Sequence, residues 1–315
     1  MKLAVPDLVS PSYFPAIAAV DLGLLGERGL SAELELRYPV TDAVDALRAG
    51  EIDVLAGSAH ALFHRAPDGG GIRLLAALSQ GTYWFLVVRS DLGFGPSTPL
   101  GALRGLRIGA APGPVDALAQ MLADAGVEPG AVDVGPVPGT GGAGVSFGVT
   151  AAEALADGRI DGFWANGMGA EVAVRRGTGT VIVDARRHAP VGADRYTFPA
   201  LMATLETCDS RPEELEAAVT GVVEAQRRLR AQPALATTVA APRFPPLETE
   251  LIETLVARDA AFYDAAITEG TLADMVAFAQ RRRMTSKDLG AGDLVAPGAP
   301  AWWSAPAAAV ETVER

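Results

Sequence analysis

Hydroxyl side chains follow two of the apolar segments of the sequence, and each hydroxyl can donate a hydrogen bond to a carboxylate or sulfonate. Ser10 and Ser12 come after the apolar residues 3–6, and Ser58 comes after the apolar residues 52–56. A serine in front of a helix is also the usual N-cap, whose oxygen accepts a hydrogen bond from a backbone N–H group of the first turn. Either role fits each serine taken alone.

A glycine-rich run, GTGGAG, occupies residues 139–144. Glycine lets the backbone approach a ligand closely because it has no side chain. The run lacks the GxGxxG spacing of a dinucleotide site and the Lys-Ser/Thr ending of a phosphate-binding loop. Together with the serines it predicts a site for a small organic anion, bound by hydroxyls and backbone amides, rather than a nucleotide site.

His60 and His64 are four residues apart, a spacing that can present two imidazoles to one metal ion. The sequence around them is not HExxH, and no third ligand is identifiable from the pattern. Cys208 is the one cysteine, so a four-cysteine zinc site is excluded. We therefore predict neither a metal nor a cofactor. His60 by itself suits an anion contact or a general base near neutral pH, and a buried, fully hydrogen-bonded imidazole is the equally simple alternative.

Strand-like and helix-like apolar patterns alternate over residues 3–56 and again after residue 105, which is typical of parallel α/β sheets. Residues 46–53 (ALRAGEID) match residues 154–161 (ALADGRID) at Ala, Leu, Gly, Ile and Asp. Two copies of one α/β unit explain this match, although helix–glycine–strand junctions resemble one another in general. Such sheets bind small molecules beyond the carboxyl ends of their strands, where helix N-termini converge.

Three pairs of residues have the spacing of a capping box and predict helix starts. They are Thr150 with Glu153, Ser210 with Glu213, and Thr271 with Asp274. After residue 210 the strand patterns stop. Three helical patterns follow, at residues 212–231, 247–267 and 272–283, and we expect them to wrap around the first lobe. A tail at residues 288–306 carries two adjacent tryptophans.

The composition excludes several classes of protein. The chain has 315 residues, 49% of them hydrophobic, and 26 Lys and Arg against 38 Asp and Glu, a net charge of −12. That charge repels the nucleic-acid backbone, and no uninterrupted apolar stretch reaches the roughly 20 residues of a membrane span. The first residues are too short an apolar run for a signal peptide. We expect a cytoplasmic protein if Met1 is the native start, and a periplasmic or cell-surface protein if a leader was trimmed.

Three segments, residues 50–58, 84–91 and 100–109, resemble the solute-binding proteins of nitrate, sulfonate and taurine ABC importers. The resemblance extends over about residues 2–285. It implies a type II periplasmic-binding-protein fold, α/β with two lobes joined by crossing strands and with a helical C-terminal extension. The lobes are then expected at residues 1–88 plus 196–315 and at residues 89–195.

The resemblance also implies a set of ligand contacts on the loops that face the cleft. Carried over by position, they are Ser10, Ser12, Tyr13, Pro39, Ser58 and His60 in the first lobe, and Ala111, Gly113, Trp164 and Asn166 in the second. The same superfamily contains cytosolic enzymes, among them a thiamine-pyrimidine-precursor synthase and an aromatic desulfinase. The desulfinase uses a cysteine where this chain has Ser10, and the synthase needs a cysteine-rich iron motif that is absent, so these two chemistries are disfavoured.

Three functions remain open from the sequence. The first is a solute-binding protein that holds a small organic anion, an aromatic or aliphatic carboxylate or sulfonate, and delivers it to an ABC permease. The second is a cytosolic lyase or hydrolase acting on an aromatic or heterocyclic acid, with His60 as general base and Ser10 or Tyr13 assisting. The third is a cytosolic sensor that binds a ligand without catalysis.

Overall fold

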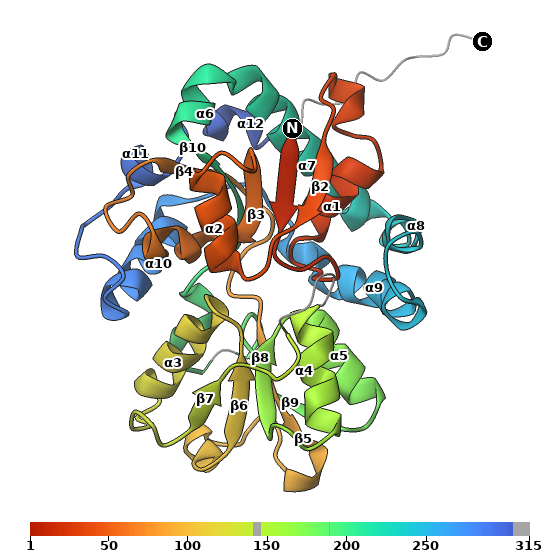
Figure 1. The fold of residues 1–315 in the computed structure, drawn as a ribbon, viewed down its shortest axis with the longest axis vertical. Coiled ribbons are helices and arrows are strands. Elements are labelled where there is room, and N and C mark those ends of the chain that lie inside the picture. Colours follow the sequence, from red (N-terminus) through yellow and green to blue (C-terminus); the bar gives the residue numbers. More distant parts are fainter. Residues whose placement is uncertain (141–145, 189, 305–315) are drawn as a thin grey trace.

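The computed structural model describes residues 1–140, 146–188 and 190–304. These residues form two five-stranded sheets in two lobes, one above the other in Figure 1. The strand order is β2-β1-β3-β10-β4 in the first sheet and β7-β6-β8-β5-β9 in the second. The α/β class and the two-lobed architecture expected from the sequence are confirmed.

The first lobe combines the N-terminal strands and helices with the C-terminal helical region. Its elements are β1 (Lys2–Val5), α1 (Phe14–Asp21), β2 (Glu33–Leu36), α2 (Val40–Arg48), β3 (Val54–Ser58), β4 (Ile72–Ala77), β10 (Pro199–Thr204), α6 (Leu205–Ser210), α7 (Pro212–Ala231), α8 (Leu235–Ala240), α9 (Pro246–Asp259), α10 (Glu269–Arg281), α11 (Ala291–Leu294) and α12 (Ala299–Trp302).

The second lobe is formed by the middle of the chain. Its elements are β5 (Phe85–Arg89), β6 (Arg107–Ala110), α3 (Pro114–Asp124), β7 (Asp133–Gly135), α4 (Phe147–Ala156), β8 (Gly162–Ala165), α5 (Gly167–Arg175) and β9 (Gly179–Asp184).

Each sheet has three parallel strands and then an antiparallel strand inserted before its last one. In the first sheet β10 lies antiparallel between β3 and β4, and in the second β5 lies antiparallel between β8 and β9. The chain therefore crosses between lobes after β4 and again after β9. Phe85–Val88 pair within the second sheet; the expected lobe boundaries at 88/89 and 195/196 stay a prediction.

The sequence repeat corresponds to equivalent positions in the two lobes. Gly50 follows α2 with a φ of +71° and Gly158 follows α4 with a φ of +69°, a left-handed conformation that favours glycine. Asp53 accepts a hydrogen bond from the backbone N–H of Lys2 at 2.6 Å, and Asp161 accepts one from the N–H of Arg107 at 3.0 Å. In both lobes the repeated aspartate therefore holds the first residue of the equivalent strand, β1 or β6, as expected of two copies of one unit.

The helix starts predicted from the capping boxes of Thr150 and Thr271 are displaced, whereas the predicted helix 212–231 coincides with α7 and only its N-cap differs from the predicted Ser210. Thr150 lies inside α4, whose N-cap is Ser146, and α7 begins after Arg211. The N-cap of α10 is Thr268, whose hydroxyl accepts a hydrogen bond from the N–H of Thr271. The spacing alone therefore selected the wrong N-cap residue at each of these junctions.

The C-terminal region packs on the first lobe, as predicted. Helix α7 lies along α1, and the short helices α11 and α12 pack against β4. The indole of Trp303 donates a hydrogen bond to the carbonyl of Leu75 at 2.8 Å, so this tryptophan attaches the tail to the sheet. Among the described residues, no helix combines the length and the apolar character needed to cross a membrane.

Helices α4 and α5 pack closely because glycines meet at their crossing. A Cβ atom added to Gly169 would lie 2.5 Å from the carbonyl oxygen of Gly148, closer than non-bonded atoms approach. Because both partners are backbone, neither helix can yield by turning a side chain. This contact sets the positions of the two helix N-termini that face the first lobe.

We expect Gly169→Ala to lower the free energy of unfolding by about 1–3 kcal/mol, the usual effect of overpacking. Urea unfolding measures this change. Gly26→Ala is the matched control, because an added Cβ there meets no atom within 4 Å. Equal stability of the two variants would show that α4 and α5 can separate freely.

Candidate functional site

A cavity lies between the lobes, at the carboxyl ends of the parallel strands of both sheets. Its volume is about 40 Å³, room for only a few water molecules. The lining comes from both lobes and comprises Pro6, Asp7, Ser10, Tyr13, Tyr38, Val40, Tyr83, Trp84, Ala111, Pro112, Pro114, Phe147, Trp164, Ala165 and Asn166. We call this space the interlobe cavity; its size indicates a closed arrangement of the lobes.

Six of the described residues that line the cavity are aromatic, and some of their rings meet across the lobes. Tyr38 of the first lobe stacks on Phe147 of the second, with ring centroids 6.2 Å apart and an angle of 19°. Trp84, at the crossing before β5, lies 6.0 Å from Trp164 at the end of β8. Planar rings on several sides favour a ligand with a flat or apolar body.

Asp7 is the only charged residue among the described residues that line the cavity. Its carboxylate follows β1 and accepts a hydrogen bond from the backbone N–H of Val9 at 2.9 Å. Across the seam, the hydroxyl of Ser146 and the side-chain amide of Asn166 each donate to its second oxygen at 2.9 Å. One carboxyl group thus connects the first lobe to the N-termini of α4 and α5.

Burial raises the pKa of Asp7 to about 6, and the hydrogen bonds from Val9, Ser146 and Asn166 oppose that rise. Desolvation disfavours the charged form of a carboxyl group, and these donors compensate it only in part. Asp7 therefore changes its charge close to neutral pH. Below that pH, the cavity has no charged side chain among its described lining residues.

Asn166 has two roles at the start of α5. Its side-chain oxygen accepts hydrogen bonds from the N–H groups of Met168 at 3.0 Å and Gly169 at 3.2 Å, so it is the N-cap of the helix. Its amide nitrogen donates to Asp7. The cap fixes which end of the amide faces the first lobe, because the oxygen is already used.

Two serine hydroxyls in the loop before α1 are buried and have no hydrogen-bond partner among the described residues. They belong to Ser10, which lines the cavity, and to Ser12, which does not. A buried polar group without a partner is costly, and such groups at a cavity wall are satisfied when a ligand binds. The Ser10 hydroxyl is therefore the free donor of the site.

A chain of hydroxyl groups connects Tyr13 and Tyr83, which line the cavity, to Ser58, which does not. Ser58 and Tyr83 are joined by a hydrogen bond of 2.7 Å, and Tyr83 is joined in turn to Tyr13. Burial raises the pKa of Tyr13 to about 12, and burial also raises the pKa of Tyr83. Both phenols stay protonated at neutral pH and act as hydrogen-bonding groups, not as bases.

His60 is fully buried, and both of its ring nitrogens have partners. Nδ1 lies 2.9 Å from the hydroxyl of Thr197, and Nε2 lies 3.2 Å from the carbonyl oxygen of Gly113 in the second lobe. A carbonyl only accepts, so Nε2 carries the proton and Nδ1 accepts from Thr197. Burial lowers the pKa of His60 to about 4, which leaves the imidazole neutral and with no free nitrogen for a general base.

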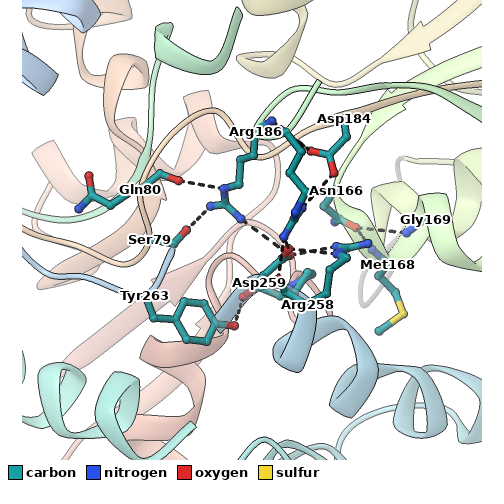
Figure 2. Close-up of polar contacts among 12 residues, drawn as sticks. Ser79, Gln80, Asn166, Met168, Gly169, Asp184, Arg186, Arg258, Asp259 and Tyr263 are labelled. Atoms are coloured by element: carbon teal, nitrogen blue, oxygen red, sulfur yellow. Dashed lines mark hydrogen bonds and ion pairs between the residues drawn. The ribbon is translucent and has the colours of Figure 1, made fainter. Parts of the chain in front are cut away.

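A cluster of charges holds the lobes together beside the cavity (Figure 2). Asp259 of α9 pairs with Arg258 at 2.9 Å and with Arg187 of the second lobe at 2.9 Å. Arg186 is also buried; it donates to the carbonyl of Gln80 at 2.8 Å and to Ser79. These contacts join the ends of β4 and β9, where the chain crosses between the lobes.

The structure brings half of the predicted contact residues to the cavity wall. Those that line it are Ser10, Tyr13, Ala111, Trp164 and Asn166; those that do not are Ser12, Pro39, Ser58, His60 and Gly113. Ser58 is hydrogen-bonded to Tyr83, which does line the cavity, and the carbonyl of Gly113 is hydrogen-bonded to His60. Of the predicted glycine run, residues 141–144 lie outside the described residues.

Sequence reasoning missed Asp7, Tyr38, Tyr83, Trp84 and Phe147, all of which line the cavity. Asp7 had a visible signal, because it directly follows the first predicted strand and so lies at a carboxyl edge. The aromatic residues had none, since an aromatic side chain at a strand end is as common in a core as in a binding site.

Residues 10–236 match the family described as NMT1/THI5 like. The chain belongs to this family. The match covers most of the chain and both crossings between the lobes. No curated protein sequence matches the chain.

Solved structures with the same fold include binding proteins and an enzyme. A ligand-binding component of an ABC-type import system from Staphylococcus aureus, with zinc bound, superposes with a TM-score of 0.72 at 15% identity, covering 96% of this chain and 98% of that one. The periplasmic aliphatic sulphonate-binding protein of Escherichia coli superposes with a TM-score of 0.69 at 12% identity, covering 96% of this chain and 99% of that one. The desulfurization enzyme DSZB gives 0.67 at 17% identity, covering 95% and 97%. At these identities the likeness concerns the fold.

The raised pKa of Asp7 predicts a pH dependence of stability. Since the pKa is about 6 in the folded chain and about 3.9 in an unfolded one, the folded state binds the extra proton between these values. The stability that Asp7 contributes is present below pH 4 and is lost as pH rises to about 6, by ~3 kcal/mol at most.

Urea unfolding of the wild type and of Asp7→Asn from pH 4 to pH 7 measures this effect. The difference between the two free energies of unfolding should change over that range in the stated direction, and the other carboxyl groups cancel in the comparison. A difference that is constant with pH would mean that Asp7 titrates normally.

Proposed function

We propose that the protein is a solute-binding protein that holds a small organic anion, with an aromatic or other flat apolar body, in the interlobe cavity and delivers it to an ABC permease. The observation that carries the proposal is the cavity between two lobes, lined by aromatic rings and by Ser10, whose buried hydroxyl has no partner among the described residues. This function also implies export to the periplasm or cell surface.

Ligand size supports a mechanism in which the lobes part. An aromatic ring needs a cavity on the order of 150 Å³, whereas the closed cavity measures about 40 Å³. Contacts that join the lobes, such as those of Asp7 with Ser146 and Asn166, would open to admit the ligand. The ligand would then exchange its own contacts for some of them when the lobes close.

The charge of the cavity restricts how an anion can be held. No lysine or arginine occurs among the described residues that line it, so the donors are neutral: the Ser10 hydroxyl, the amide of Asn166 and backbone N–H groups. Ionised Asp7 would repel the anion. Its pKa is already about 6, so a modest further rise, caused by the bound anion, keeps the carboxyl group protonated at neutral pH. A protonated carboxyl group can itself donate a hydrogen bond to the ligand.

The enzymatic alternative has less support from the geometry. Its proposed base, His60, does not line the cavity and has both nitrogens engaged. Tyr13 does line the cavity, but its pKa of about 12 leaves it protonated. Incubation of the best-bound compound with the protein tests this point directly, because chemical turnover would contradict a purely binding function.

Ser10→Ala should weaken the binding of the tightest anion found among benzenesulfonate, benzoate, taurine and nitrate. A hydrogen bond to a charged group contributes about 1.5–3 kcal/mol, so the Kd should rise about ten- to hundredfold. Titration calorimetry measures the Kd, and fluorescence of the cavity tryptophans gives an independent readout.

Ser12→Ala is the matched control for this experiment. Both serines are buried and unpartnered in the same loop, but only Ser10 lines the cavity. The control should leave the Kd unchanged. If none of the four anions binds, or if both variants weaken binding equally, the proposed site or ligand class is wrong.

Benzenesulfonate should bind more weakly as pH rises through about 6. The sulfonate stays charged throughout this range, so the change reports the protein, and ionisation of Asp7 places a like charge in the cavity. If the bound anion raises the pKa of Asp7 by one unit, the affinity falls about tenfold between pH 5 and pH 8. Asp7→Asn should show a flat profile; an equal pH dependence in this variant would exclude Asp7 as the titrating group.

A further inference from the structure

A second group of ligand-type atoms lies at the seam, outside the interlobe cavity. One ring nitrogen each of His60 and His64 and one carboxylate oxygen of Asp116 all lie within 4.8 Å of one another. The histidines lie in the short helical turn Ala59–His64 of the first lobe, and Asp116 lies in the first turn of α3 in the second. None of the three lines the cavity. We call them the seam triad.

The pairwise distances suit a common divalent cation. Nε2 of His64 lies 2.9 Å from Oδ2 of Asp116, and the three ligand atoms all lie within 4.8 Å of one another. Ligands at about 2.0–2.2 Å from a tetrahedral zinc ion lie ~3.3 Å from one another. His64 and Asp116 are partly exposed, so they can make the small movement that brings the three atoms to this spacing.

The surroundings orient the triad as they orient metal ligands. A ligating histidine usually donates its second ring N–H to a hydrogen-bond partner. For Nε2 of His60 to bind the metal, the imidazole takes its other neutral tautomer: Nε2 gives up its hydrogen bond to Gly113, and Nδ1 donates to the hydroxyl of Thr197, which lies 2.9 Å away. Arg282 approaches Oδ1 of Asp116 at 3.9 Å, which leaves Oδ2 directed at the histidines. The positive charge of Arg282 repels a metal cation and so lowers the affinity of the triad for it. The guanidinium does not occupy the position of a ligand atom.

We propose that the seam triad binds a divalent transition-metal ion of the zinc class and that this ion ties the two lobes together in their closed arrangement. Two imidazoles and one carboxylate are a donor set that zinc accepts, with a further position open to water. Since the ligands come from both lobes, the ion binds the closed form more tightly than the open one, and it therefore favours closure. Its binding does not depend on the identity of the solute.

Zinc titration in competition with a chromophoric chelator tests the proposal on the full chain. We expect one ion per chain in the wild type and a Kd at least about tenfold higher in His64→Ala and in Asp116→Asn, since even the supporting residues of metal sites change affinity tenfold or more. Cobalt(II), used in place of zinc, should give the visible absorption of a low-coordinate site in the wild type and lose it in both variants.

His188→Ala is the matched control, because His188 is the third and last histidine of the chain and is exposed. This variant should bind zinc and cobalt as the wild type does. Thermal unfolding without metal shows that each variant is folded, and added zinc should raise the melting temperature of the wild type and of His188→Ala alone. Wild-type affinity in both triad variants, or no stoichiometric binding in the wild type, would overturn the proposal.

Discussion

The buried carboxyl group of Asp7 joins the two lobes at the cavity. Taking a carboxyl group out of water is unfavourable unless hydrogen bonds replace its hydration, and two of its donors, Ser146 and Asn166, belong to the other lobe. Separation of the lobes would remove both donors and return the group to water. Closure, protonation of Asp7 and the chemistry of the cavity are therefore linked through one side chain.

The cluster around Asp259, beside the cavity, joins the lobes through charged side chains, whereas the cavity itself is lined mainly by neutral groups. Burial acts to raise the pKa of Asp259, but Arg258, Arg186 and Arg187 hold it below its ordinary value. A buried ion pair needs this number of partners to compensate its desolvation. The cluster lies where the chain crosses between the lobes, so it can hold them together at the crossing while the contacts of Asp7 open. In the proposed opening, the contacts of Asp7 break at the cavity, and the Asp259 cluster keeps the lobes joined at the crossing.

Membership of the NMT1/THI5-like family and the two-lobed fold do not distinguish binding from catalysis, because this fold is found both in binding proteins and in a desulfurization enzyme. The decision lies in the side chains at the seam. In this chain, the described groups nearest the cavity are protonated phenols, a free hydroxyl and a carboxyl group of raised pKa. These groups are suited to hold a ligand, and the one imidazole close by is already fully hydrogen-bonded.

The sequence by itself determined the α/β class, the duplicated unit and the strand ends from which the site is built. Periodicity and the repeated Gly50 and Gly158 are local properties, so they are readable from neighbours along the chain. Which strand-end residues meet depended on contacts more than 100 residues apart, as between Asp7 and Asn166, and only the tertiary structure could decide it. For the same reason His60 and His64 had no visible third partner in the sequence, whereas the closed lobes bring Asp116 beside them.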